Sequence, residues 1–410
     1  MRAGWQKKTL IEACHFSNGL WKGEKEPFVN VGVIRNTNFT KDGALDDSDI
    51  AYLDVEAKKF EKRRLQFGDI ILEKSGGGPK QPVGRVVLFD KQEGLFSFSN
   101  FTSALRIKDP QELDFRFLHK LLYWTYLCGI TEKMQSHSTG IRNLDGNAYK
   151  AIEISFPALA EQRRIAAILD EALAGIATAC SAAEQNRQNS RALFDSCLQD
   201  VFSLRGKGWQ EKPLSELCNI KHGFAFKSEF FTDKGDHILL TPGNFYESGG
   251  YRDRGVKQKY YCGDIPTGFI LEKNDLLVAM TEQAAGLLGS PILVPEPGRF
   301  LHNQRLGLVT PKTGVPWLNE FFFHVFNTQA VRKAIHGSAS GVKVRHTSPT
   351  KIGEVVVAFP SSVDEQRCIV SKLEEIQDET RHLEALYQRK LEALDELKRS
   401  LLHHAFSGNL

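Results

Sequence analysis

The sequence predicts an α/β (α+β) protein built from two pseudo-symmetric halves, in which each half is a globular domain followed by one long helix. Three observations predict this class. Sequence identities recur at a fixed separation, which is typical of a duplicated unit. Short apolar runs alternate with glycine-rich turns in the first part of each half. Each half then ends in a long stretch with apolar residues at heptad spacing.

The internal repeat has a separation of 204 residues. The tripeptide GWQ at 4–6 recurs at 208–210, and EQR at 161–163 recurs at 365–367. Duplicated units usually assemble about a two-fold axis, so we expect a pseudo-dimer within one chain, with its two termini close together. Further matches at the same shift are Leu10 with Leu214, Cys14 with Cys218, Gly19 with Gly223 and Phe202 with Phe406.

The globular parts are expected at 1–157 and 205–360. Strand-like apolar runs lie at 67–72, 83–89, 271–280 and 306–309, with turns such as the glycines at 76–78 and 249–250 between them. Helices are expected at about 110–135 and 315–336. Together these features predict a mixed α/β domain in each half.

The long helices are expected at 158–204 and 361–410. A helix of about 42 residues would extend about 63 Å. A single such helix could be an ordinary surface helix or an oligomerisation coil, but two equal helices favour an intramolecular antiparallel pair. The expected seam positions are Ile165, Leu169, Ala172, Ile176, Ala179, Ala183, Asn186, Ser190, Leu193 and Cys197, and Ile369, Leu373, Ile376, Thr380, Leu383, Tyr387, Lys390, Leu394, Leu397 and Leu401.

Composition limits the class of protein but does not decide its ligand. The 410 residues are enough for two or three domains, and the net charge is only +3. We see neither a signal peptide nor an apolar run of about 18 residues, so we expect a cytoplasmic protein outside the membrane. The seven cysteines form no C-x-x-C pair, which predicts reduced thiols and no metal site. The weak basicity means either that DNA is not the ligand or that partner subunits supply much of the phosphate contact.

The junction between globular part and helix resembles a known family. The first copy reads STGIRNLDGNAYKAIEISFPALAEQRRIAAIL, and the second reads SASGVKVRHTSPTKIGEVVVAFPSSVDEQRCIVSKL. A small residue and glycine lead to a strand, then to Phe-Pro, Glu-Gln-Arg and an apolar helix. This order is similar to that of specificity subunits of type I restriction–modification systems, although the second copy has Ser340-Gly341 in place of threonine-glycine.

The resemblance implies a non-catalytic subunit with two target-recognition domains joined by two antiparallel helices. It implies three kinds of partner: double-stranded DNA, two methyltransferase subunits and the nuclease-translocase subunits. S-adenosylmethionine, ATP and magnesium would belong to those partners, so we expect no cofactor, metal or catalytic residue here. The partner contacts that it implies at the helix starts are Glu161, Gln162, Arg163, Glu365, Gln366 and Arg367.

Several loops carry side chains that suit DNA recognition. Arginine pairs with guanine, asparagine and glutamine pair with adenine, and lysine, serine and backbone N–H groups hold phosphates. The segment 328–351 is basic and contains no acidic residue. Each loop could equally be a solvated turn. The candidates are Ser75, Gly76, Lys80, Ser138, Thr139, Arg142, Asn143, Gln283, Asn303, Gln304, Arg305, Ser340, Lys343, Arg345 and His346.

Two functional hypotheses follow from these patterns. Two unlike readers on a helical spacer would recognise a split, asymmetric DNA site, with centres roughly one to one and a half DNA turns apart. The alternative is a coiled-coil scaffold with two divergent ligand-binding domains that do not bind DNA. Motifs of an amino-methyltransferase, an ATP-binding P-loop and an H-E-x-x-H metalloenzyme are absent from the sequence.

Overall fold

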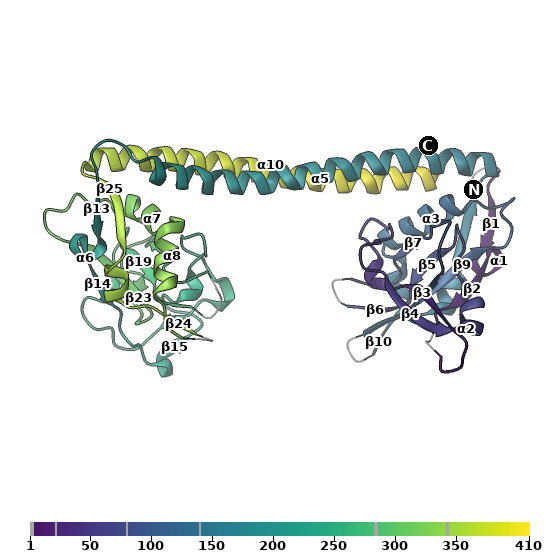
Figure 1. The fold of residues 1–410 in the computed structure, drawn as a ribbon, viewed down its shortest axis with the longest axis horizontal. Helices are drawn as coiled ribbons and strands as arrows, with labels where there is room; N and C mark the ends of the chain where they lie inside the picture. The colour runs from purple at the N-terminus through teal and green to yellow at the C-terminus, as the bar shows by residue number, and fades with distance from the viewer. Residues whose placement is uncertain (1–3, 21–22, 79–80, 139–140, 283–285, 342–343) are drawn as a thin grey trace. The chain divides into compact units, whose positions relative to one another are not determined.

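The computed structural model describes residues 4–20, 23–78, 81–138, 141–282, 286–341 and 344–410. The chain divides into two compact units. Unit 1 comprises Met1–Glu184 and Gln388–Leu410, and unit 2 comprises Gln185–Tyr387. Each unit contains one globular part, which we name head 1 (residues 4–157) and head 2 (residues 205–362), together with stretches of both long helices (Figure 1).

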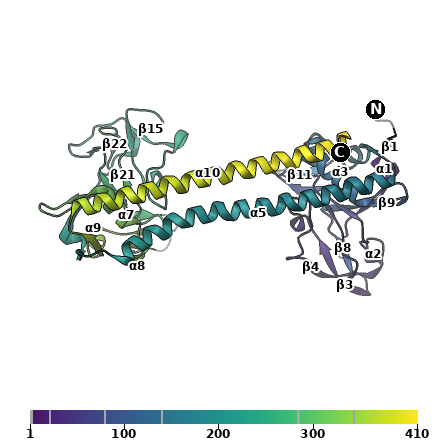
Figure 2. The ribbon, with the colours of Figure 1, turned by 90° about the horizontal axis from the view of Figure 1, so that it is seen from above.

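The two long helices are α5 (Leu159–Leu204) and α10 (Val363–Ser407). In unit 1 the start of α5 and the end of α10 share one hydrophobic core with head 1. In unit 2 the end of α5 and the start of α10 pack on the core of head 2. The helices therefore run antiparallel within each unit, as Figure 2 shows.

The burial of the two long helices agrees with the predicted heptads at some positions and differs at others. Leu169, Ile176, Leu373 and Thr380 are buried as expected. Leu193, Leu383 and Leu397 are instead exposed, and the residue after each is less exposed. These following positions are Phe194, Glu384 and Lys398. Because Glu384 and Lys398 are charged, the apolar pattern of the sequence did not indicate this register. In unit 2 Arg191 forms a 3.1 Å ion pair with Glu384.

Part of α5 is apolar enough, at a mean hydropathy of 1.5, to satisfy the length and composition of a membrane span. This corrects the expectation that no segment reaches that limit. Ile165, Ala166 and Leu169 of this helix lie in the core of unit 1, and Asp170 forms a 2.7 Å ion pair with Lys120 of head 1. Part of the apolar face of this helix is thus packed against its own unit, although only 17% of the apolar window is buried.

Head 1 is built around a four-stranded antiparallel sheet, β2-β9-β5-β7, and a second sheet, β4-β3-β8. Helix α3 (Phe115–Leu127) packs on the first sheet. The strands are β1 (Gln6–Thr9), β2 (Cys14–Asn18), β3 (Phe28–Ile34), β4 (Ala51–Glu56), β5 (Ile70–Glu73), β6 (Ser75–Gly77), β7 (Val86–Leu88), β8 (Phe96–Phe98), β9 (Thr102–Ile107), β10 (Gln135–Ser138), β11 (Ile141–Leu144) and β12 (Glu153–Phe156), and the short helices are α1 (Leu10–Ala13), η1 (Asn36–Asn38), α2 (Ala57–Glu61), η2 (Ile130–Met134) and α4 (Gly146–Lys150).

Head 2 repeats this arrangement with sheets β14-β23-β19-β21 and β15-β17-β16-β22-β18. The expected helix at 315–336 is interrupted at Thr328, whose hydroxyl caps the second helix. The elements are β13 (Trp209–Pro213), α6 (Leu214–Leu217), β14 (Cys218–His222), η3 (Ser228–Phe230), β15 (Phe231–Thr232), β16 (His237–Leu239), η4 (Pro242–Asn244), η5 (Gly255–Lys257), β17 (Tyr260–Tyr261), β18 (Ile270–Leu271), β19 (Leu276–Ala279), β20 (Thr281–Glu282), β21 (Pro291–Leu293), β22 (Phe300–Leu301), β23 (Leu306–Pro311), α7 (Asn319–Asn327), α8 (Gln329–Gly337), β24 (Arg345–His346), α9 (Pro349–Gly353) and β25 (Val356–Pro360).

Each head is closed by aromatic rings from residues far apart in the sequence. In unit 1 the ring of Phe117 contacts Trp5 and Phe406 at centroid distances of 6.4 and 5.4 Å. The end of the chain thus packs close to its beginning, as the repeat predicts. In unit 2 the corresponding triad is Phe321, Trp209 and Phe202, each 204 positions from its counterpart.

Candidate DNA-reading strands

Five of the predicted residues of head 1 meet on one small sheet. Strand β11 pairs with both β10 and β6, which brings Arg142 and Asn143 beside Gly77 and Ser75. The hydroxyl of Ser75 donates a 2.5 Å hydrogen bond to Oδ1 of Asn143. The Asn143 amide nitrogen and the Arg142 guanidinium make no hydrogen bond to any other described residue, so both donors are available to a ligand. The five residues are Ser75, Gly76, Ser138, Arg142 and Asn143, of which Ser138 is described by its backbone alone.

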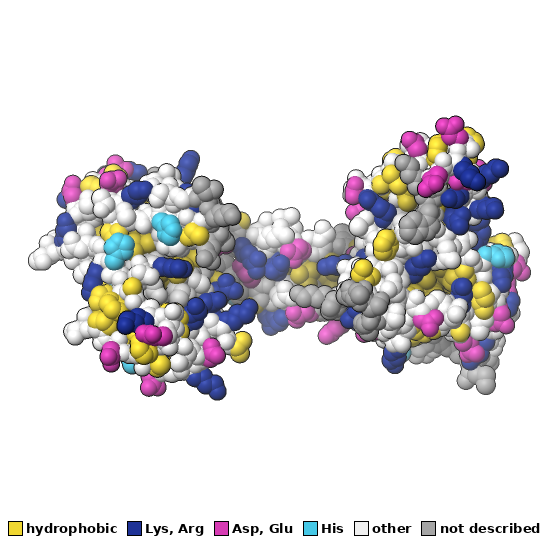
Figure 3. All heavy atoms as spheres, turned by 90° about the horizontal axis from the view of Figure 1, so that it is seen from below, with side chains coloured by type: hydrophobic (Ala, Val, Ile, Leu, Met, Phe, Trp, Pro, Cys, Tyr) yellow, Lys and Arg dark blue, Asp and Glu magenta, His cyan; other side chains and the backbone are white. Residues whose placement is uncertain are grey.

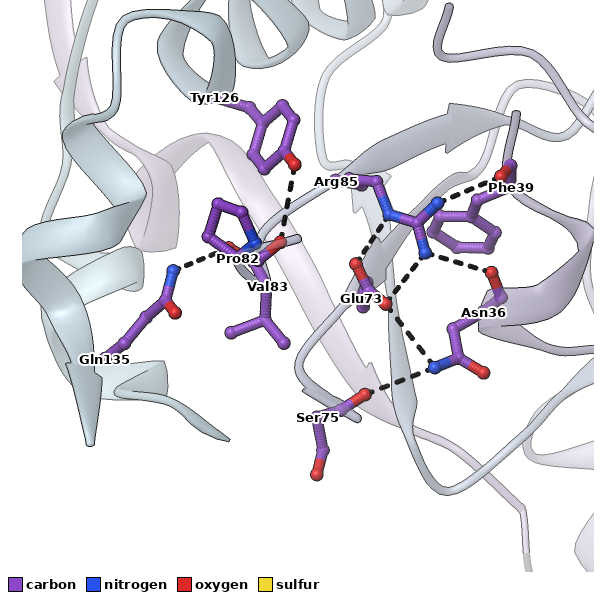
Figure 4. Close-up of polar contacts among 9 residues, drawn as sticks. All are labelled: Asn36, Phe39, Glu73, Ser75, Pro82, Val83, Arg85, Tyr126 and Gln135. Atoms are coloured by element: carbon purple, nitrogen blue, oxygen red, sulfur yellow. Dashed lines mark hydrogen bonds and ion pairs between the residues drawn. The ribbon is translucent and has the colours of Figure 1, made fainter. Parts of the chain in front are cut away.

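A buried ion pair supports the base of this sheet. Glu73 precedes β6 and is almost fully buried, and it accepts hydrogen bonds from Arg85 at 2.7 and 2.9 Å (Figure 4). Arg85 also donates to the backbone carbonyls of Asn36 and Phe39. The Asn36 amide in turn lies 3.4 Å from Glu73 and 3.5 Å from the Ser75 carbonyl. This network fixes the backbone from which the Ser75 side chain projects.

Gly76 occupies a position that other residues rarely adopt. Its φ is +103°, and a Cβ there would lie 2.7 Å from the Asn36 amide nitrogen. Tight packing therefore requires glycine in β6. Close approach of its backbone to DNA, our sequence-based expectation, remains a prediction.

Head 2 has the equivalent arrangement in a shorter form. Strand β20 pairs antiparallel with β24, so Thr281 lies opposite His346 and Glu282 opposite Arg345. The Thr281 hydroxyl and His346 Nδ1 are 3.1 Å apart. A hydroxyl on the first strand therefore holds the polar side chain on the second strand in both heads, with Ser75 and Asn143 in one and Thr281 and His346 in the other.

The supporting acid of head 2 is Glu282, which is also almost fully buried. Its carboxylate accepts from the backbone N–H groups of Leu287 and Leu288 at 3.0 and 2.9 Å. Arg345 lies 3.5 Å from the carboxylate and also bonds the His336 carbonyl. His336 lies 3.6 Å from the same acid, and burial lowers the pKa of His336. Arg345 thus secures its strand in this structure, unlike Arg142, whose guanidinium has no partner in the part of the chain that the structure describes.

The remaining candidates of head 2 lie on two separate turns. Asn303 accepts from the Arg305 backbone N–H at 3.1 Å, which shapes a turn that leaves the side chains of Gln304 and Arg305 exposed. Ser340 forms two backbone hydrogen bonds with His346. Four candidates, Lys80, Thr139, Gln283 and Lys343, lie outside the described residues.

The predicted partner contacts at the helix starts divide into two kinds. Gln162 and Gln366 are fully buried. Gln162 Nε2 donates to the carbonyls of Glu112 and Pro157, and Gln366 Nε2 donates to those of Pro316 and Pro360. This placement does not fit direct contact with a partner, because both side chains join a helix to its own head. Of the other four, Arg163 and Arg367 are exposed, Glu161 is partly exposed, and Glu365 accepts from the Trp209 ring nitrogen at 3.2 Å.

The sequence reasoning missed the residues that support the strands. Glu73 and Glu282 become buried, and Arg85 largely so, only when distant segments meet. Glu282 stood within a candidate loop, but its spacing from Arg345 gave no signal of their pairing.

Comparison with known families identifies the chain. The family model for the type I restriction modification DNA specificity domain matches residues 3–181 and again residues 206–393. The chain belongs to this family. The matching model describes a DNA specificity domain, so the family favours DNA recognition, and nothing in the comparisons supports a scaffold that does not bind DNA.

Curated relatives agree with this assignment. The specificity subunit of the type I restriction enzyme EcoBI from Escherichia coli is 26% identical over 54% of this chain and 43% of its own length. The StySPI specificity subunit from Salmonella potsdam is 26% identical over 92% of this chain and 82% of its own length. The chain thus spans less than half of the first relative and most of the second.

Solved structures show the same fold. A chain from a structure described as the basis of complex assembly and conformational transition of the type I R-M system matches all of this chain and 99% of its own, with a TM-score of 0.78 and 17% identity. The HsdS subunit of Thermoanaerobacter tengcongensis matches all of this chain and 98% of its own, with a TM-score of 0.61 and 16% identity. Two heads joined by paired long helices are therefore the fold of this chain.

Proposed function

We propose that this chain reads a split, asymmetric DNA site, with one element recognised by each head. The observation that carries the proposal is the pair of equivalent strands, β6 with β11 and β20 with β24, that present different polar side chains in the two heads. Asparagine offers both a donor and an acceptor to adenine, whereas histidine presents ring nitrogens. Unlike readers on equivalent strands would select unlike sequences.

The proposed target-recognition domains are residues 1–157 and 205–360, and the proposed joining helices are residues 158–204 and 361–410. The chain would bind double-stranded DNA, two methyltransferase subunits and nuclease-translocase subunits in the cytoplasm. The proposed partner contacts at the helix starts are the exposed Arg163 and Arg367 and the partly exposed Glu161. The chain itself would supply no catalytic group, so S-adenosylmethionine, ATP and magnesium would be held by the partner subunits.

The test is to co-express the full chain with its methyltransferase partner and to map methylated adenines across the host genome. We expect one split motif whose two elements differ. Asn143→Ala should relax only one element, and His346→Ala only the other, because they lie in different heads. Asn30→Ala is the matched control, since Asn30 is an exposed asparagine of head 1 that bonds Asp54 on a different sheet.

The proposal is contradicted by methylation that continues unchanged when the chain is deleted. It is also contradicted if Asn143→Ala leaves both elements intact while the protein remains folded by circular dichroism.

A further inference from the structure

Head 2 contains a basic cavity beside strand β20. The cavity has a volume of about 440 Å³, and its polar lining includes Arg254, Lys259, Arg305 and Thr281. None of its described lining residues is acidic. Thr281 is also the residue that bonds His346, so the cavity adjoins the proposed reading strands.

The cationic groups around this cavity have no carboxylate partner among the described residues. The Arg305 side chain makes no hydrogen bond or ion pair there, although its backbone is fixed by bonds to Asn303 Oδ1 and to the Met280 N–H. Lys259 lies over the ring of Phe231 at 5.4 Å. Converging cations without a counter-charge repel one another, so the arrangement favours the binding of an anion.

Arg254 reaches the cavity across a glycine. A Cβ added to Gly243 would lie 3.1 Å from Cζ of Arg254, so the guanidinium packs directly over the backbone of η4. The backbone N–H of Arg254 donates to Gln258, whose side chain is buried and also bonds Asn244. Both arginines therefore project from backbones that are already ordered.

Head 1 lacks two of these cations at equivalent positions. The backbone N–H of Gly19 donates to the Thr102 carbonyl, and the backbone N–H of Gly223 donates to the Leu306 carbonyl. Thr102 is therefore equivalent to Leu306, and the residue before it, Phe101, is equivalent to Arg305. The backbone N–H of Asp46 donates to the Asn38 carbonyl, and the backbone N–H of Arg252 donates to the Asn244 carbonyl. Asp46 is therefore equivalent to Arg252, and Ser48, two residues later, is equivalent to Arg254. The cavity with its unpaired cations is thus a feature of head 2 and not of the shared fold.

We infer that the basic cavity of head 2 binds a phosphate of the DNA backbone next to the element that head 2 reads. This inference rests on the proposed function. The guanidinium and ammonium donors of the cavity suit an oxyanion, and phosphate contacts fix the register of a protein on DNA. Figure 3 shows basic side chains on the face of each head that it displays.

The test measures DNA binding by the full chain with its methyltransferase partner, on a duplex that contains the mapped site, over a range of salt concentrations. Arg305→Gln and Arg254→Gln should each make the slope of log K against log salt shallower by about 1, and weaken binding roughly tenfold at about 0.1 M salt. The methylated motif should stay the same, because a phosphate contact carries no base sequence. Arg299→Gln is the matched control, since Arg299 is an exposed arginine of head 2 that pairs with Glu296 at 3.2 Å.

An unchanged slope in both variants would overturn the inference, as would a change of the methylated motif at one base pair, which would indicate base reading. Titration of the full chain with inorganic pyrophosphate tests whether the cavity is instead a site for free anions. The inference is also overturned if Arg305→Gln abolishes pyrophosphate binding but leaves the salt dependence of DNA binding unchanged. Thermal unfolding of each variant checks that the fold is intact. If the unaltered protein did not bind the mapped DNA site specifically, that result would instead count against the proposed function.

Discussion

At the scale of single residues, the glutamine of each EQR motif acts as a clamp between helix and head. Gln162 satisfies two carbonyls and also accepts from the Asp114 N–H at 2.8 Å. Gln366 satisfies two carbonyls, but its Oε1 has no partner in the described structure. The identical motif therefore makes three hydrogen bonds in unit 1 and two in unit 2.

Truncation of this glutamine should destabilise its own unit. Gln162→Ala leaves three buried backbone groups without partners, at about 1 to 3 kcal/mol for each group that water does not reach. Gln366→Ala should have the smaller effect, because one bond fewer is lost. Thermal unfolding checks this, with Gln185→Ala, an exposed glutamine of α5, as the control. Equal melting temperatures for Gln162→Ala and Gln185→Ala would contradict the clamp.

Three buried histidines make stability depend on pH. Burial lowers the pKa of His119, His302 and His324 to about 4, from about 6.5 in the unfolded chain. The unfolded state therefore binds more protons between pH 6.5 and 4, and stability falls as the pH falls through this window. Each histidine can account for roughly 3 kcal/mol at the acid end.

Melting temperatures measured from pH 7.5 to pH 5 test this effect. We expect the decline to be shallower in His302→Gln, which removes one titrating group from head 2, than in His222→Gln, which alters an exposed histidine of the same head. Parallel declines in the two variants would show that His302 does not contribute.

At the scale of elements, the position of the seam along α5 decides which leucines stabilise the paired helices. Leu198 is 3% exposed, whereas Leu193, which heptad counting placed in the seam, is 48% exposed. The difference arises because polar residues such as Glu384 occupy seam positions and apolar residues extend beyond them. Hydrophobic spacing alone therefore predicted the buried face of the helix with an error of about one residue in register.

The two leucines give a direct test of this register. Leu198→Ala should destabilise unit 2 by about 2 to 4 kcal/mol, because it leaves a cavity in a packed region. Leu193→Ala should change stability by less than about 0.5 kcal/mol, because the side chain is already in solvent. Urea unfolding followed by circular dichroism compares them. A larger loss for Leu193→Ala would restore the register expected from the sequence.

At the scale of the whole molecule, each head is completed by the end of a long helix that begins in the other half of the chain. Phe406 at the end of α10 packs on Phe117 of head 1, and Phe202 at the end of α5 packs on Phe321 of head 2. The hydrophobic core of each head therefore includes helix residues from outside that head's own segment of sequence.

This interdependence predicts local consequences for equivalent substitutions. Phe406→Ala should reduce hydrogen-exchange protection in head 1, and Phe202→Ala should reduce it in head 2, each by about 3 to 5 kcal/mol of local stability. Exchange followed by mass spectrometry resolves the two heads, and each variant serves as the control for the other. Loss of protection at 115–127 in the Phe202→Ala protein would contradict the assignment.

The sequence by itself determined the duplication, the two long helices and the family. These features depend on local patterns, since matched motifs and heptad spacing can be recognised without knowing which segments meet. The residue types also selected the segments that carry Ser75, Arg142, Asn143, Arg345 and His346 as candidates for DNA contact, and that role stays a prediction.

Only the tertiary structure decided which of those segments lie together and which side chains are free. The Arg142 guanidinium has no partner among the described residues, while Arg345 lies beside Glu282, yet both stand at the same place in the repeat. The buried acids, the clamping glutamines and the three cations of the head 2 cavity follow from burial and pairing between residues tens of positions apart. Those interactions depend on distance in space, which residue type and local spacing do not specify.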